Sequence, residues 1–144
     1  MPAATQQQVT FLPADFAQLN NRTMRLWWPN GYGEPYLHEA GYTFHIDGEQ
    51  PARITYKAGL RQMTYTDIDT RLKIYVNGKR FVPLGGNWGF SEQNLLYRGR
   101  EYDIAVKYHR DMNFNMIRNW VGMTGDEEFY EACDKYGVMV WQDF

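Results

Sequence analysis

Polar and aromatic side chains follow short apolar runs of this sequence at the points where those runs end. Arg118 and Trp120 follow the run at residues 115–117, and Gly122 comes soon after them. In a parallel α/β fold, side chains at the carboxyl end of a strand point into the ligand crevice, and the apolar run before them is core. A guanidinium group can hold a hydroxyl or a carboxylate with its planar fork of donors. An indole can stack on the apolar face of a sugar ring. Arg118 and Trp120 are therefore candidate binding residues.

Two further segments have the same arrangement. Residues 81–84 lead into Asn87 and Trp88, and residues 138–141 lead into Gln142 and Asp143. The run at 138–141 is continuously apolar, which is typical of a strand that is buried on both faces. Because parallel strands end at one edge of a sheet, we expect Trp88, Arg118 and Gln142 to surround one hollow. The candidate substrate-binding residues are Asn87, Trp88, Arg118, Trp120, Gln142 and Asp143.

The segments between these runs have the hydrophobic period of core-facing helices. The first helix is predicted over residues 100–114 with Ile104, Tyr108 and Met112 on its buried stripe, and the second has Phe129, Ala132, Cys133 and Tyr136 on its stripe and ends at Gly137. The order strand, helix, strand, helix, strand predicts the first three units of a β/α barrel, with strands that begin at Phe81, Met116 and Val138. An open doubly wound sheet is the less favoured alternative.

The first half of the chain has a different pattern. Residues 25–33, 36–48, 53–57 and 62–66 read as short strands rich in aromatic and β-branched residues, and residues 72–84 contain a hairpin with an Asn77-Gly78 turn. This pattern predicts an antiparallel sandwich that is present only in part. We place the domain boundary near residue 70 and, since no flexible linker is visible, expect the two parts to pack rigidly.

Composition and charge narrow the choice of partners. The chain has 144 residues, a formal net charge of −2, and 17% aromatic residues, including 5 Trp and 11 Tyr. This charge gives no field that would attract nucleic acid or an anionic membrane, whereas surplus aromatic rings suit sugar binding. Cys133 lies on a helical apolar stripe and is predicted to be a small buried side chain. No metal site or cofactor is expected, and the N-terminus has no signal-peptide pattern.

The chain resembles glycoside hydrolase family 2, in the branch of β-mannosidases, endo-β-mannosidases and exo-β-glucosaminidases. The resemblance starts near residue 24 and is carried by segments at residues 26–33, 57–61, 77–88, 113–120 and 129–144. It implies a multidomain β plus α/β protein: residues 1–70 would be the C-terminal part of an immunoglobulin-like β-sandwich domain, and residues 71–144 the N-terminal part of a (β/α)8 TIM barrel. The segment Gly89-Phe90-Ser91-Glu92-Gln93 departs from the family's more usual Ile-Pro-Ala-Asp.

The resemblance also implies a function. Such enzymes are retaining β-glycosidases that use one carboxylate as acid/base and one as nucleophile. The family places both after later strands, so we expect no catalytic residue in this chain; it would contribute residues of the −1 sugar subsite and be inactive alone. β-Mannosides are the favoured substrate, with β-glucosaminides and β-galactosides as alternatives. A neutral Gln142, where the glucosaminidase branch tends to have an acidic residue, disfavours glucosaminides.

The alternative function is that of a non-catalytic carbohydrate-binding or structural module. In either case the expected partners are a β-linked carbohydrate and the remainder of the parent protein, and an isolated segment is expected to self-associate. We expect no nucleic-acid or membrane partner. A periplasmic or secreted parent fits the resemblance, although the sequence itself leaves localisation undetermined.

Overall fold

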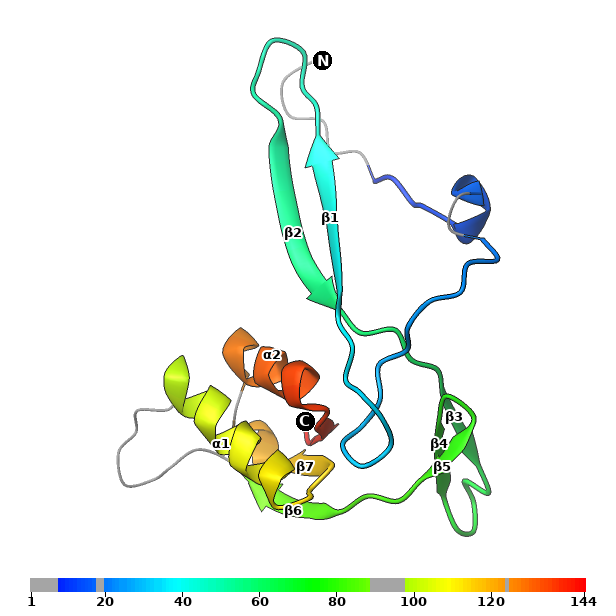
Figure 1. Ribbon diagram of the computed structural model, residues 1–144, viewed down its shortest axis with the longest axis vertical. Coiled ribbons are helices and arrows are strands. Elements are labelled where there is room, and N and C mark those ends of the chain that lie inside the picture. The colour runs from blue at the N-terminus through cyan, green and yellow to red at the C-terminus, as the bar shows by residue number, and fades with distance from the viewer. Residues whose placement is uncertain (1–7, 18–19, 89–97, 124) are drawn as a thin grey trace.

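A computed structural model describes residues 8–17, 20–88, 98–123 and 125–144 of the chain. Three separate sheets and two helices follow one another along the sequence (Figure 1). The elements are η1 (Pro13–Asp15), β1 (His38–Phe44), β2 (Ala52–Ala58), β3 (Met63–Thr66), β4 (Lys73–Val76), β5 (Lys79–Phe81), β6 (Gly85–Trp88), α1 (Arg100–Asp111), β7 (Met116–Asn119), η3 (Trp120–Gly122), α2 (Glu127–Tyr136) and β8 (Met139–Gln142).

A parallel sheet of order β6-β7-β8 forms the C-terminal half, with α1 between the first two strands and α2 between the last two. This is the predicted alternation of strands and helices. The strand start predicted at Met116 is confirmed, and the one predicted at Val138 is one residue before the observed start at Met139. The start predicted at Phe81 is wrong, because β6 begins at Gly85. Phe81 instead ends β5, where it pairs with Ile74.

One hydrophobic cluster lies between this sheet and its two helices. Its buried members are Tyr102, Val106, Ile117, Phe129, Ala132, Cys133 and Val138. The predicted stripe of α2 is confirmed, since Phe129, Ala132 and Cys133 are buried. The helix ends where Gly137 adopts the left-handed φ of 75°, and the Val138 amide donates to the Cys133 carbonyl at 2.9 Å.

The predicted stripe of α1 is wrong. Tyr108 and Met112 are 60% and 56% exposed, whereas Tyr102 and Val106 are fully buried. Residues 102, 106 and 109 also share one face of a helix, and Trp88 of the sheet packs against Tyr102 and His109. The aromatic contact from β6 decides which of two apolar stripes faces the core.

Antiparallel pairs make up the first half. Strands β1 and β2 form a long hairpin that extends away from the rest of the molecule (Figure 1). Strands β3, β4 and β5 form a second sheet, and Asn77 and Gly78 make the tight β4–β5 turn with φ values of 50° and 77°. The predicted boundary near residue 70 falls between β3 and β4, which pair with each other.

Trp27 joins this antiparallel half to the helices. Its side chain is 1% exposed and shares a second hydrophobic cluster with Val76, Phe81 and Met139. Its indole Nε1 donates to the Asp134 carbonyl of α2 at 2.7 Å. Near Trp27 in the sequence, the Asn30 side-chain amide donates to the carbonyls of Arg110 and Phe114, both at 2.9 Å. These contacts join the antiparallel half to the helices, and rigid packing between the two parts stays a prediction.

The Trp27 and Asn30 contacts lie at the end of the parallel sheet where its strands begin. The Asn30 side chain binds two carbonyls between the end of α1 and the start of β7. The Asn30 backbone N–H donates to the Gly137 carbonyl, just before β8 begins. The carboxyl ends of the strands are therefore left for other contacts. Neither described helix is long and apolar enough to span a membrane.

Candidate functional site

Strand register divides the candidate residues between the two faces of the parallel sheet. Asn87, Arg118 and Trp141 lie side by side on one face, because they are paired across β6, β7 and β8. Trp88, Asn119 and Gln142 are the next residues along the three strands, so their side chains point to the other face. Ile117 shares that second face and is buried against the helices. The first face is therefore the one that α1 and α2 leave uncovered.

Arg118 and Asp143 form a two-point ion pair at the carboxyl edge of the uncovered face. Arg118 Nε donates to Asp143 Oδ1 at 3.1 Å, and Arg118 Nη2 lies 2.9 Å from Asp143 Oδ2. Arg118 Nη1 also reaches Asn87 Oδ1 at 3.5 Å. One guanidinium group thus links the ends of all three strands. Such a paired, planar arrangement fixes the orientation of both side chains better than a single contact does.

Asp143 is held in its ionised form by these contacts. The hydrogen bond from Arg118 lowers the pKa of its carboxyl below the ordinary value, and the Val121 backbone N–H, 3.2 Å from Oδ2, lowers it further. The Arg118 side chain is 44% exposed and that of Asp143 is 20% exposed. The pair is therefore ordered but open to solvent on one side, where a polar ligand can reach its remaining donors.

Val121 has an unusual backbone conformation beside this pair. It follows β7 within η3 and has φ 55° and ψ 24°, the left-handed region that a β-branched residue rarely adopts. Such a conformation costs on the order of 1–3 kcal/mol and is concentrated at functional sites. Here it directs the Val121 N–H at the Asp143 carboxylate. No sequence pattern indicated this residue, because valine is among the side chains least suited to that conformation.

Trp88 packs inside the fold, on the face opposite Arg118. Its ring stacks on Phe129 with centroids 5.5 Å apart and contacts Tyr102 edge-on at 6.3 Å. The expectation that Trp88, Arg118 and Gln142 surround one hollow is therefore wrong. The physical reason is the pleat of the strand, since consecutive residues such as Asn87 and Trp88 must point to opposite faces.

Gln142 makes its hydrogen bonds within the protein, on the same face as Trp88. Its Oε1 accepts from Asn119 Nδ2 and from the Tyr130 hydroxyl, both at 2.8 Å. Its Nε2 donates to the Asp143 carbonyl, also at 2.8 Å. Gln142 thus directly precedes Asp143, the ion-pair partner of Arg118, and its side-chain amide is hydrogen-bonded to both β7 and α2.

Two tryptophans lie near the pair with exposed rings. Trp120 begins η3 directly after β7 and is 48% exposed, and Trp141 is 56% exposed on the same face as Arg118. The expectation that the run at 138–141 is buried on both faces is wrong for Trp141. Trp141 was also absent from the candidate residues, although its register with Arg118 places it beside the site. Side chains alternate between the two faces along a strand, so Trp141 and Asp143, two residues apart, are expected on the same face. That alternation could have identified Trp141 from the sequence.

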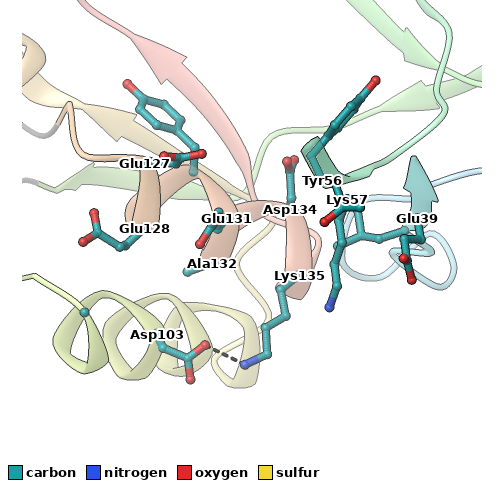
Figure 2. Close-up of a pocket in the computed structure, with 14 residues that line it drawn as sticks. Glu39, Tyr56, Lys57, Asp103, Glu127, Glu128, Glu131, Ala132, Asp134 and Lys135 are labelled. Atoms are coloured by element: carbon teal, nitrogen blue, oxygen red, sulfur yellow. Dashed lines mark hydrogen bonds and ion pairs between the residues drawn. The ribbon is translucent and has the colours of Figure 1, made fainter. Parts of the chain in front are cut away.

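A separate cleft of about 890 Å³ lies between the β1–β2 hairpin and α2, and it contains none of the six candidate residues. Figure 2 shows Glu39 and Lys57 of the hairpin opposite Glu131 and Asp134 of α2. Within it, Asp103 of α1 binds Lys135 at 2.6 Å. Burial raises the pKa of Asp134 above its usual value. Among the described residues, no group of three or more His, Cys, Asp or Glu side chains could hold a metal ion.

Comparisons with known proteins cover nearly all of this chain. No protein-family model matches it. It is 38% identical over its whole length to a mannosylglycoprotein endo-beta-mannosidase of Lilium longiflorum and 35% identical over 99% of its length to a beta-mannosidase B of Aspergillus terreus. It is 32% identical over 83% of its length to an exo-beta-D-glucosaminidase of Hypocrea jecorina. The chain spans only 15%, 17% and 13% of these relatives' own lengths.

Solved structures agree with these relatives. A beta-D-mannosidase from Dictyoglomus thermophilum matches 83% of the chain with a TM-score of 0.59 and 25% identity, and the match covers 16% of that enzyme. A beta-glucuronidase from Parabacteroides merdae matches 81% of the chain with a TM-score of 0.60 and 19% identity, over 14% of its own length, which shows a shared fold. The three relatives and the beta-D-mannosidase structure together show that the chain belongs to glycoside hydrolase family 2.

Proposed function

We propose that this chain is part of a retaining β-glycosidase and supplies residues of its −1 sugar subsite, with β-mannosides as the preferred substrates. The observation that carries the proposal is the Arg118–Asp143 pair on the uncovered face of a parallel sheet, at the carboxyl ends of the strands. Ligand sites of β/α folds lie at that edge. The relatives of highest identity above are named for action on mannosides, which favours a mannoside over the alternatives.

The proposed architecture extends the described elements. Strands β6, β7 and β8 with α1 and α2 would be the first three units of a (β/α)8 barrel, so the uncovered face of the sheet would line the barrel interior. Residues 1–70 would end an immunoglobulin-like sandwich, and residues 71–144 would begin the barrel. An isolated chain is then expected to be inactive and to self-associate, because among the described residues the outer edges of the parallel sheet have no partner strand, and Arg118 and Trp141 on the face away from α1 and α2 remain exposed.

The residues would have distinct roles in that subsite. The Arg118 guanidinium group, held in place by Asp143, would donate to a sugar hydroxyl or to the nucleophile carboxylate supplied elsewhere in the parent protein. Asn87 would add an amide to the same face. Trp120 and Trp141 expose indole rings that could stack on a sugar. Trp88 and Gln142 would support the site from the opposite face.

The test is hydrolysis of aryl glycosides by the full-length protein that contains this chain. Release of the aryl group from β-mannoside, β-glucosaminide and β-galactoside would be compared, and the anomer first formed would be followed by NMR. We expect the β-mannoside to have the highest kcat/KM and the β-anomer to form first, because a retaining enzyme displaces the sugar twice. No hydrolysis of any of the three, or initial formation of the α-anomer, would contradict the proposal.

The non-catalytic module is the second candidate. It is favoured by one observation, namely that the ordered Arg118–Asp143 pair can bind a hydroxyl without any catalytic carboxylate. Under this alternative the full-length protein would bind β-linked oligosaccharides in calorimetry but release no aryl group from the same glycosides. Binding together with hydrolysis would exclude it.

A further inference from the structure

We infer that Gln142 is a positioning residue that orients the Asp143 carboxylate, and through it Arg118, from the face of the sheet opposite the site. The inference deepens the proposed function and rests on it for its catalytic meaning. It gives Gln142 a different role from the sugar contact expected from the sequence. Its basis is the set of three hydrogen bonds made by one side-chain amide.

The amide links two elements, β7 and α2, to the residue that carries the carboxylate. Asn119 is the last residue of β7, and Tyr130 lies in the first turns of α2. Both donate to Gln142 Oε1, while Gln142 Nε2 donates to the Asp143 carbonyl. The position of Asp143 is therefore fixed relative to β7, the strand that carries Arg118.

This position requires a side chain that both accepts and donates. A leucine would remove the acceptor for Asn119 and Tyr130 and the donor for Asp143, although its size is similar. A glutamate would keep the acceptor but place a carboxylate oxygen against the Asp143 carbonyl. A glutamine satisfies all three partners at neutral pH, because its Oε1 accepts from Asn119 and Tyr130 while its Nε2 donates to the Asp143 carbonyl.

Gln142 affects the Arg118–Asp143 pair through the backbone at the end of β8. Asp143 follows Gln142 directly, and its backbone N–H also approaches the Asn119 carbonyl at 3.4 Å. If the Gln142 amide is lost, the segment after β8 can move, and the two-point contact between Arg118 and Asp143 lengthens. The Asp143 carboxyl should then titrate closer to an ordinary aspartate, because the lowering of its pKa comes first from the Arg118 hydrogen bond.

The first experiment is an NMR pH titration of the Asp143 side-chain carboxyl carbon in this chain. The variants are Gln142→Leu and Tyr130→Phe, and the control is Val106→Ala, which opens a cavity in the buried helix cluster without touching the amide. We expect the Asp143 midpoint to rise in Gln142→Leu toward that of an ordinary aspartate, because the hydrogen bond from Arg118 that lowers its pKa is weakened. Tyr130→Phe, which removes one of three hydrogen bonds, should give a smaller shift in the same direction. Val106→Ala should give none.

Two outcomes would overturn the positioning role in the chain. One is a Gln142→Leu midpoint that does not differ from the wild-type midpoint. The other is an equal rise in Val106→Ala, which would mean that the shift reports general loosening of the fold. If Gln142→Leu does not fold, Tyr130→Phe decides the question by the same comparison.

The second experiment measures kcat and KM in the full-length protein with the same substitutions. Gln142→Leu should lower kcat/KM for the aryl β-mannoside by about tenfold, and Val106→Ala should leave it within twofold when both are assayed well below their unfolding temperatures. A moved Asp143 midpoint with unchanged kcat/KM would overturn the positioning role, because the contact would then be structural only. A parent that hydrolyses no glycoside would refute the proposed function instead, while the titration would still report on Gln142.

Discussion

Replacement of Trp27 should separate the contribution of its hydrogen bond from that of its packing. The ring is 1% exposed, and its Nε1 donates at 2.7 Å to a carbonyl in the last turn of α2, where no helical partner is available. Trp27→Phe keeps a buried ring but removes this donor, which should cost about 1–3 kcal/mol. Trp27→Ala also empties the cluster around Val76, Phe81 and Met139 and should cost about 3–5 kcal/mol.

The assay is urea unfolding followed by far-UV circular dichroism, with Trp141→Phe as the control. Trp141 is 56% exposed, so this control replaces a tryptophan that is mostly in solvent and should change the free energy of unfolding by less than about 0.5 kcal/mol. Amide exchange should also accelerate in the last turn of α2 in Trp27→Phe. If Trp27→Phe costs no more than Trp141→Phe, the claim that this indole joins the antiparallel half to α2 is refuted.

Three other substitutions or reagents test separate parts of the fold. Gly137→Ala should lower the free energy of unfolding by about 1–2 kcal/mol in thermal melts, because φ at this position is 75° and a Cβ would lie 3.0 Å from the Asn30 nitrogen; an unchanged melting temperature would contradict the left-handed cap. The Cys133 thiol is 2% exposed, and burial raises its pKa, so a disulfide reagent at pH 8 should label it only as fast as the chain unfolds; immediate labelling would place it outside the core. Burial also raises the pKa of Asp134, so the folded state favours its protonated form and this contribution to stability is lost as pH rises through the folded pKa. Asp134→Asn should therefore stabilise the chain at pH 7 and have little effect below the ordinary aspartate pKa, and equal effects at both pH values would count against the assignment.

The sequence predicted the order of elements in the C-terminal half, because hydrophobic period and caps are local properties. The stripe of α2 and its end at Gly137 follow directly from residues within the helix. The stripe of α1 did not, because two sets of apolar positions compete within it. Contact of Tyr102 with Trp88, from a distant strand, selects the buried set.

The candidate site was predicted in part, and its division between two faces was not. Arg118, Asp143 and Asn87 do come together on one face. The pleat alone could have placed Trp88 and Gln142 on the other face and added Trp141, since consecutive strand residues alternate. The left-handed conformation of Val121 could not have been predicted, because it depends on contacts after β7 that outweigh the preference of valine.

The most direct test of the account is the effect of Arg118→Ala on kcat/KM for an aryl β-mannoside in the full-length protein. Arg110→Ala is the matched control, because Arg110 lies near the other end of the sheet and pairs with its neighbour Asp111. We expect Arg118→Ala to lose about 2–4 kcal/mol of transition-state stabilisation, roughly a 30- to 900-fold drop in kcat/KM, and Arg110→Ala to lose less than about threefold. If Arg118→Ala lowers kcat/KM no more than Arg110→Ala does, the result would contradict a sugar subsite built on the Arg118–Asp143 pair.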